Sequence, residues 1–371
     1  MKILVASDKF KGSLTAVEAC AAIADGLREA LPDHRHEIRC LPIADGGDGI
    51  AETLLAAGGG EWIVVHVSGP LGDPVTAGYA LIDGGKTAVI EMAKASGLVL
   101  LGDGAKDPIF ASTFGTGQLI RHALESGVRE ILLGIGGSAT NDGGTGMAEA
   151  LGFRFEDAEG AAITGLPVGL DHVTRILPPD KTTFPRVTVA CDVVNPLLGP
   201  TGCTRVYGPQ KGISPENFTM HEDRLAHLVT LVGEAAVVAA DRPGAGAAGG
   251  LGFGAMVFLD AELVPGFDLV AERLGLADAI AESDFVITGE GRLDAQSLEG
   301  KGPHGVVRLA RKLGKPTAAF CGSLGHPRLQ SDFGPIIEIG DPSVSLAENM
   351  ARGHELLRDS ARRAAATLLN S

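Results

Sequence analysis

Carboxylate side chains recur directly after short apolar runs of this sequence. Five glycine- or proline-containing segments carry at least one each: Asp8; Asp45 and Asp48; Asp142; Asp192; Glu290 and Asp294. Any one alone suits a turn or a helix N-terminus, since Asp is favoured at both and helix N-termini attract negative charge. As a set at strand ends, they also suit a site where acids hold Mg²⁺ or accept the proton of an attacking hydroxyl.

Basic residues stand close to these acids in the sequence. They are Lys9 and Lys11, Arg205 and Lys211, and Arg292 and Lys301. Phosphoryl transfer needs this mixture, because backbone amides hold phosphates, acids hold the metal and cations neutralise the transferred group. The residues themselves therefore favour a site for metal and phosphate.

The segment GIGGSATNDGG (134–144) follows an apolar run and is rich in glycine. A glycine-rich loop after a strand usually presents backbone N–H groups to phosphate. This loop contains no Lys or Arg and carries Asp142 instead. Asp142 either organises a metal or caps the next helix, and the sequence leaves both readings open.

Four other patterns predict structure rather than chemistry. GGKT (84–87) lies between two predicted strands, so it reads as a hairpin and not a P-loop. GAGAAG (244–249) follows a predicted helix, whereas a dinucleotide fingerprint needs a preceding strand; a phosphate nest or tight packing remains open. His34–His36 fall in a charged turn without an HExxH pattern. Ser138 is not in a GxSxG elbow, so a hydrolase triad has no anchor.

Strands alternating with helices predict an α/β fold with a parallel sheet. The predicted strands are 2–6, 37–43, 130–135, 187–191 and 284–288, followed by PTAAF and PIIEI. Thr15 and Glu18 form a capping box that predicts a helix start. Residues 62–97 alternate strands and turns without a helix, which indicates antiparallel pairing. We therefore expect a discontinuous doubly wound domain of five strands (1–64 plus 285–371) and an inserted α/β domain with a mixed or antiparallel sheet (65–284).

Composition limits the partners. The net charge of −15 and the lack of a basic block argue against nucleic acid and membrane surfaces. Five scattered cysteines without a C-x-x-C pair indicate reduced thiols, and no signal peptide or membrane span is apparent. These features predict a soluble, cytoplasmic protein.

Seven stretches together resemble the glycerate kinase family, of the first of the unrelated glycerate kinase types. They are ASDKFKGSLTA, PIADGGDG, FGTGQLI, GIGGSATNDGGTGM, CDVVNPLLG with GPQKG, PGAGAAGGLGFG and TGEGRLDAQSLEGK. The stretches AAFCGSLG and IGDPSVSLAENM, towards the C-terminus, depart from the family's pattern.

The resemblance implies ATP- and Mg²⁺-dependent phosphorylation of D-glycerate, with the C2 hydroxyl as the expected acceptor and 2-phosphoglycerate and ADP as products. A 3-phosphoglycerate-forming enzyme is the alternative. It also implies a flavodoxin-like or Rossmann-like domain with a second α/β domain, a cleft between them as the site, and a monomer or homodimer.

On this resemblance we assign roles by residue. The expected catalytic residues are Asp192 (the general base), Lys9, Lys11 and Asp45. Nucleotide-binding residues are Gly136, Gly137, Ser138, Thr140, Asn141, Gly244, Gly246 and Gly291. Substrate-binding residues are Asp8, Ser13, Asp48, Arg205, Lys211 and Asp294, and the Mg²⁺ ligands are Asp45, Asp48 and Glu290.

Two rival functions come from other classes. A nicotinamide-dependent oxidoreductase would use 244–249, and a non-catalytic protein would bind a sugar acid without turnover. The acids at the strand ends count against the second.

Overall fold

The computed structural model describes residues 1–31, 36–102, 104, 106–180, 184–294, 302–325 and 329–369. It divides into two compact units, one formed by Met1–Asp45, Glu52–Gly58 and Gly266–Ser371, the other by Gly46–Ala51 and Gly59–Pro265. Helices α10 (Gly266–Arg273) and α11 (Leu276–Glu282) join the first unit because α11 packs on strand β1 and helix α12. The domain bounds expected from the sequence, 1–64 plus 285–371 for one domain and 65–284 for the other, remain a prediction.

The first unit is built on a five-stranded parallel sheet. In sheet order its strands are β14 (Ile336–Glu338), β13 (Thr317–Leu324), β12 (Phe285–Leu293), β1 (Lys2–Val5) and β2 (Glu37–Cys40). Counted along the chain within the unit, this is the order 2-1-3-4-5 of flavodoxin-like doubly wound sheets. The predicted parallel α/β fold is confirmed.

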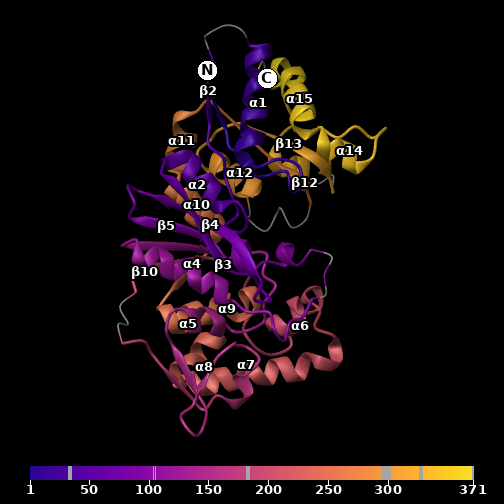
Figure 1. Ribbon diagram of the computed structural model, residues 1–371. Coiled ribbons are helices and arrows are strands. Elements are labelled where there is room, and N and C mark those ends of the chain that lie inside the picture. Colours follow the sequence, from indigo (N-terminus) through magenta and orange to yellow (C-terminus); the bar gives the residue numbers. More distant parts are fainter. Residues whose placement is uncertain are drawn as a thin grey trace. The chain divides into compact units, whose positions relative to one another are not determined.

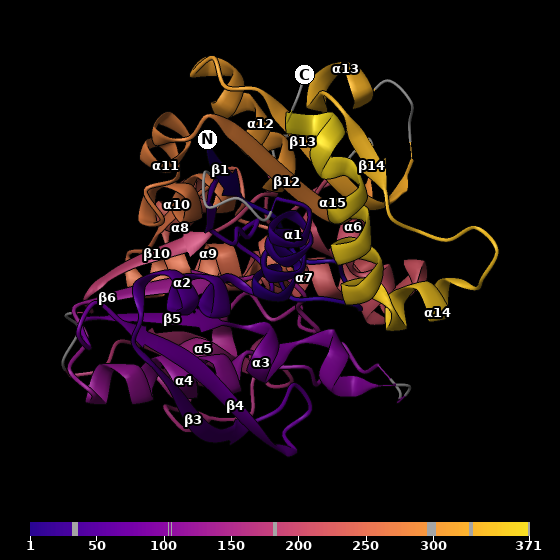
Figure 2. The same ribbon diagram turned by 90° about the horizontal axis from the view of Figure 1, so that it is seen from above.

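Helices cover both faces of this sheet because alternate strand residues point to opposite sides. On one side, Phe320 and Ile287 pack in a buried cluster with α1 (Ala16–Ala30) and α15 (Gly353–Leu369). On the other, Cys321 and Leu293 pack with α12 (Gly302–Lys312) and α13 (Gln330–Phe333). Figure 2 shows β12 and β13 running between α15 and α12. The remaining helices of the unit are α14 (Leu346–Ala351) and most of α2 (Ile50–Gly58).

The helix starts follow from local capping. Thr15 and Glu18 form the predicted capping box at the start of α1, and Ser345 and Glu348 form a second one at α14. The last helical region consists of two helices, since α14 ends at Ala351 and α15 begins at Gly353.

Strand β12 is longer than predicted. The sequence places a loop after Thr288, but β12 continues to Leu293, and Glu290, Arg292 and Leu293 pair with β13. A β-carbon on Gly291 would lie 3.2 Å from Lys11 N, so glycine lets this extension pack against the loop after β1. Glu290 therefore lies within a strand and not in a loop.

The second unit contains a six-stranded mixed sheet. In sheet order its strands are β11 (Glu262–Val264), β10 (Arg186–Ala190), β6 (Glu130–Gly134), β5 (Thr87–Glu91), β4 (Pro74–Ile82) and β3 (Glu61–Ser68). The first four are parallel, and β3, β4 and β5 pair antiparallel as predicted for residues 62–97. Asp83 and Gly84 have positive φ values of 54° and 64° between β4 and β5, which confirms the hairpin at GGKT. A small antiparallel sheet joins β7 (Arg154–Glu156), β8 (Ala162–Ile163) and β9 (Arg175–Leu177).

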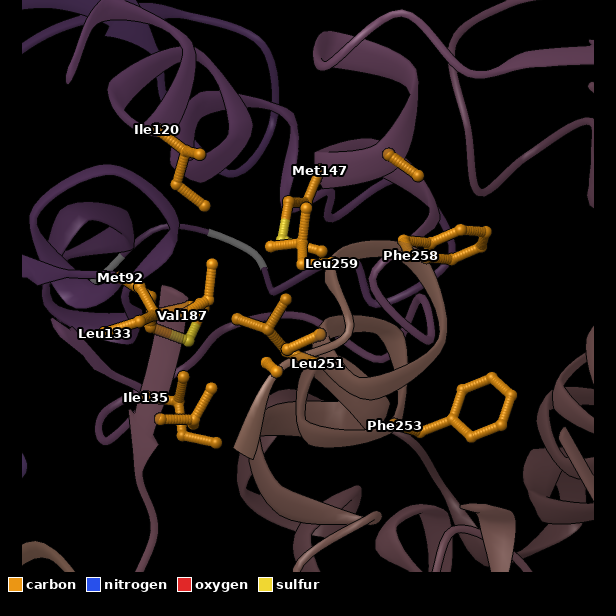
Figure 3. Close-up of a cluster of buried hydrophobic side chains, with 14 of the residues drawn as sticks. Met92, Ile120, Leu133, Ile135, Met147, Val187, Leu251, Phe253, Phe258 and Leu259 are labelled. Carbon is orange, nitrogen blue, oxygen red and sulfur yellow. The ribbon is translucent and has the colours of Figure 1, made fainter. Parts of the chain in front are cut away.

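Helices bury one face of the mixed sheet. They are α3 (Ala93–Ser96), α4 (Phe114–Glu125), α5 (Thr145–Ala150), α6 (Cys203–Tyr207), α7 (Phe218–Val232), α8 (Glu234–Ala240) and α9 (Ala247–Leu259). Figure 3 shows Leu133 and Val187 from the strands in one buried cluster with Ile120 of α4, Met147 of α5 and Leu251 of α9. In the described ranges, no helix combines the length and the apolar character that crossing a bilayer requires.

Close approach of α1 and α15 depends on Gly26. The two helices lie side by side (Figure 1), and a β-carbon on Gly26 would lie 2.1 Å from Arg358 O. Backbone atoms cannot yield as a flexible side-chain end can, so any side chain here forces the helices apart.

We predict that Gly26→Ala destabilises the protein by about 1–3 kcal/mol, the usual cost of overpacking a close contact. Gly58→Ala in α2 is the matched control, because a β-carbon there meets nothing within 4 Å. Urea unfolding of the three proteins measures the difference. A Gly26→Ala variant as stable as Gly58→Ala would contradict this account of the helix pair.

Candidate active site

The order of the first sheet reverses between β1 and β12, and this switch point gathers several of the predicted residues. Asp8 follows β1, and its backbone N–H donates to Gly289 O of β12 at 2.8 Å. Glu290 is the next residue of that strand, and Asp45 follows β2. Ligands of open α/β sheets bind beyond the carboxyl ends of the strands at such a reversal. The sheet order thus makes this end the natural ligand site of the first unit.

Burial gives Asp8 an unusual protonation behaviour. Its carboxyl is 6% exposed, and a β-carbon on Gly302, the first residue of α12, would lie 2.7 Å from its Oδ2. Burial raises the pKa of Asp8 to about 7, reinforced by the negative charges of Asp45 and Glu290 and opposed by the charge of Lys9 and the hydrogen bond from its N–H. A carboxyl that titrates near neutrality is typical of functional sites.

Other predicted residues of the first unit have visible partners. Lys9 Nζ lies 3.7 Å from Asp45 Oδ1, and both side chains are partly exposed. Ser13 Oγ donates to Met350 O, which ties the loop after β1 to α14. Asp294 Oδ2 lies 3.3 Å from Arg292 Nε. Lys11 is exposed, and Lys301 lies outside the described residues.

Asp142 of the glycine-rich segment is a capping residue. It is fully buried, and its carboxylate accepts hydrogen bonds from the N–H groups of Thr113, Gly144 and Gly146 and from Thr113 Oγ1. Burial raises its pKa, and these hydrogen bonds oppose the rise. Oδ2 accepts three of these bonds and Oδ1 accepts one, from the N–H of Gly144, so the contacts of the carboxylate support the capping interpretation over the metal interpretation.

Most of the predicted nucleotide-binding residues in the same segment point inward. Ser138, Thr140 and Asn141 are buried; Thr140 Oγ1 donates to Ala248 O at 3.4 Å and Asn141 Nδ2 to Thr204 Oγ1 at 3.0 Å. Asn141 Oδ1 has no hydrogen-bond partner within the described part of the chain. Gly137 is exposed and Gly136 is partly exposed, so their backbone is what the segment offers to a ligand.

The two predicted cations of the second unit have protein partners. Lys211 is 2% exposed, and its Nζ donates to Thr140 O at 2.6 Å. Burial lowers its pKa to about 8, and the charges of Cys203 and Asp142 oppose the shift. Arg205 pairs with Glu222 Oε2 at 2.8 Å and lies over the ring of Phe218. Lys211 therefore supports the loop backbone from within.

Gly244 and Gly246 are explained by packing. A β-carbon on Gly246 would lie 2.2 Å from Pro196 O, and one on Gly244 would lie 2.9 Å from Cys191 Sγ. Helix α8 precedes these glycines, whereas a dinucleotide fingerprint requires a preceding strand, so they do not form such a fingerprint.

Three further acids belong to the second unit. Asp192 follows β10 directly and is partly buried, whereas Asp48 is exposed in the turn before α2. Glu91, at the end of β5, is 1% exposed and was missed by the sequence analysis. The sequence pattern could have identified it, because Glu91 ends the apolar run of residues 87–91 just as the other acids follow apolar runs.

The described residues hold no group of three or more His, Cys, Asp or Glu side chains arranged to bind a metal. Mg²⁺ bound together with a nucleotide usually takes only one or two protein carboxylates, and Asp45 and Glu290, both charged neighbours of Asp8, are carboxylates of the first unit that could supply them.

Comparison with known proteins decides the class. The pattern of the glycerate kinase family matches residues 3–369. The chain belongs to the glycerate kinase family. It is 44% identical to a glycerate kinase of Halalkalibacterium halodurans, over 97% of this chain and 96% of that protein, and 45% identical to the glycerate 2-kinase of Escherichia coli K12, over 87% and 86%. A crystal structure described as glycerate kinase 2 from Salmonella typhimurium LT2 matches with a TM-score of 0.87 at 40% identity, covering 99% of this chain and 98% of that one. The protein is thus a kinase that phosphorylates an alcohol group.

For this glycerate kinase family member we predict that Asp8→Asn changes how stability depends on pH. An unfolded Asp titrates near 3.8 and the folded Asp8 near 7, so folding takes up a proton in between and this carboxyl costs stability as pH rises from about 4 to 7. Asn cannot titrate, so the variant should gain stability relative to wild type between pH 5 and pH 8. Urea unfolding in EDTA measures this gain.

Asp73→Asn, at an exposed turn, is the control and should show no such gain. An Asp8→Asn difference that is equal at pH 5 and pH 8 would contradict the raised pKa.

Proposed function

We propose that this protein transfers the γ-phosphoryl group of ATP, with Mg²⁺, to the C2 hydroxyl of D-glycerate, giving 2-phosphoglycerate and ADP. The observation that carries the proposal is the 45% identity to a relative named glycerate 2-kinase. The buried carboxyl of Asp8 and the positive charge of its neighbour Lys9 support the proposal, because phosphoryl transfer uses acidic groups together with cations that neutralise the phosphates.

The glycerate site is proposed around the carboxyl ends of β1 and β2. Lys9 and Lys11 would attract the substrate carboxylate, and Asp8 would accept a hydrogen bond from a hydroxyl. Ser13 and Asp294 would make weaker contacts with the substrate, because Ser13 already donates to Met350 O and Asp294 pairs with Arg292. In the same way, Arg205 and Lys211 would act only by exchanging their present partners, Glu222 and Thr140 O, for substrate.

The nucleotide site is proposed at the backbone of Gly136 and Gly137, with Gly291 as a further glycine contact. Ser138, Thr140 and Asn141 would contribute by fixing that backbone from inside. Gly244 and Gly246 would act in the same indirect way, since packing accounts for both.

Asp45, Asp48 and Glu290 are the proposed Mg²⁺ ligands, of which one or two suffice when phosphate oxygens complete the coordination. When bound, Mg²⁺ neutralises charge on the phosphates during transfer. The five cysteines form no disulfide, which supports a reducing, cytoplasmic setting for the enzyme. We propose that it acts as a monomer or homodimer.

Asp192 is the proposed general base, because it lies directly after β10, is partly buried and is followed by the stiffening segment that ends at Pro196. We predict that Asp192→Asn lowers kcat by ~10²–10⁴-fold while ATP still binds, as expected for loss of proton transfer. Steady-state kinetics and ATP titration measure the two effects. Asp241→Asn, at an exposed position after α8, is the control, and near-normal turnover of Asp192→Asn would remove Asp192 from this role.

The reaction itself is tested with purified protein, ATP, Mg²⁺ and D-glycerate. We expect ADP formation that depends on glycerate and is abolished by EDTA, with 2-phosphoglycerate identified by ³¹P NMR. No ADP would contradict the kinase assignment for this substrate, and 3-phosphoglycerate would contradict the choice of hydroxyl.

A further inference from the structure

Glu91 joins two loops of the second unit that are far apart in the sequence. Its Oε1 accepts hydrogen bonds from Gly49 N at 3.0 Å and from Ala51 N at 2.9 Å. These two N–H groups belong to the start of α2, where the helix leaves donors without intrahelical partners. Glu91 thus caps α2 from a strand end, across 40 or more residues of sequence.

The same contacts hold the turn that carries Asp48. This turn lies against the glycine-rich segment, since a β-carbon on Gly136 would lie 3.1 Å from Gly47 Cα and one on Gly134 would lie 3.0 Å from Gly46 O. The N–H of Met92, next to Glu91, donates to Gly134 O at 2.9 Å. Three segments, 46–51, 91–94 and 134–137, are therefore fixed against one another.

The two carboxylate oxygens of Glu91 have different surroundings. Oε2 is buried with no hydrogen-bond partner in the described residues, and Lys94 Nζ faces it at 3.8 Å. A buried carboxylate that keeps one oxygen unbonded is expensive, so it is retained where its negative charge is needed. Here the charge strengthens the two bonds to the loop, because hydrogen bonds to ionised acceptors are about twice as strong as neutral ones.

We propose that Glu91 is a positioning residue that holds the 46–51 loop, and with it Asp48, in the conformation that phosphoryl transfer requires. The proposal rests on the proposed function for its catalytic consequence and on the contacts above for the loop itself. Glu91 acts through the loop and does not touch substrate.

Glu91→Gln is the sharpest test because it keeps the size of the side chain. If the Gln amide oxygen accepts from the loop, its NH₂ group faces the ammonium group of Lys94 and has no acceptor there. If the amide is flipped, its NH₂ group faces the N–H groups of Gly49 and Ala51, which are donors as well. We expect hydrogen exchange in a peptide covering residues 46–58 to quicken by ~10-fold or more, as for loss of a charge-assisted hydrogen bond. We also expect kcat/KM for glycerate phosphorylation to fall by ~10–100-fold, with a raised KM for MgATP, the range for residues that orient metal ligands.

Glu149→Gln is the matched control. Glu149 of α5 also accepts two loop N–H groups, from Gly165 at 3.0 Å and Leu166 at 3.2 Å, but holds none of the proposed site residues. It should leave kcat/KM within about twofold of wild type. A loss of activity as large as that of Glu91→Gln would show a general stability effect and would overturn the proposal.

Asp48→Asn gives the second arm. If Glu91 acts through the Asp48 loop, Glu91→Gln should cost less than about twofold when Asp48→Asn is already present, because coupled residues are not additive. An equal loss in both backgrounds would overturn the proposal. If glycerate is not phosphorylated at all, the proposed function fails, and the exchange measurement still decides on Glu91: unchanged exchange at 46–58 would overturn its role in holding the loop.

Discussion

Backbone packed directly on backbone is the constraint on which the second unit depends. A β-carbon on Gly249 would lie 1.9 Å from Thr140 O, and one on Gly254 would lie 2.5 Å from Gly143 O. Ala248, Gly249 and Gly250, near the start of α9, all have positive φ, so the helix is kinked where it packs against the 134–144 segment. Glycine is needed at this contact because a side chain has no room there, and the contact fixes the loops whose exposed backbone is proposed to meet the nucleotide.

Buried carboxylates of one chemical type serve different purposes here because their surroundings differ. Asp142 accepts four hydrogen bonds, two of them from the N–H groups of Gly144 and Gly146 at the start of α5. Glu91 gives one oxygen to a loop and faces Lys94 with the other. Burial raises the pKa of Asp8 to about 7, Asp45 and Glu290 add to the rise and Lys9 opposes it, so this carboxyl can exchange a proton near neutral pH. Burial raises the pKa of all three, and the number and charge of their partners distinguish their surroundings.

The doubly wound order of the first sheet places segments from the beginning and from the last third of the chain side by side. Strand β12, from late in the sequence, pairs with β1, so Ser7 Oγ donates to Gly289 O across 282 residues. The reversal of the sheet order therefore brings together segments such as SDKFKGS and TGEGRLD, which no local sequence window contains together. This is the physical basis for the spread of the family's motifs along the whole chain.

Much of the fold was determined by local signals in the sequence. Apolar runs, the Thr15–Glu18 capping box and the Asp83–Gly84 turn fix strands, a helix start and a hairpin, because each depends on neighbours a few residues away. The family could likewise be identified from sequence motifs alone, without the structure. The sequence could not show that β12 runs on to Leu293, because that extension depends on pairing with β13.

The roles of single acids and glycines were decided by tertiary structure alone. Whether Asp142 binds a metal or caps a helix depends on Thr113, and whether Gly246 cradles a phosphate or admits a neighbouring chain depends on Pro196 O. Sequence shows the residue type, which sets what a group can do. Only the packed structure shows which partners surround it, and for a buried polar group those partners set the energy of each role.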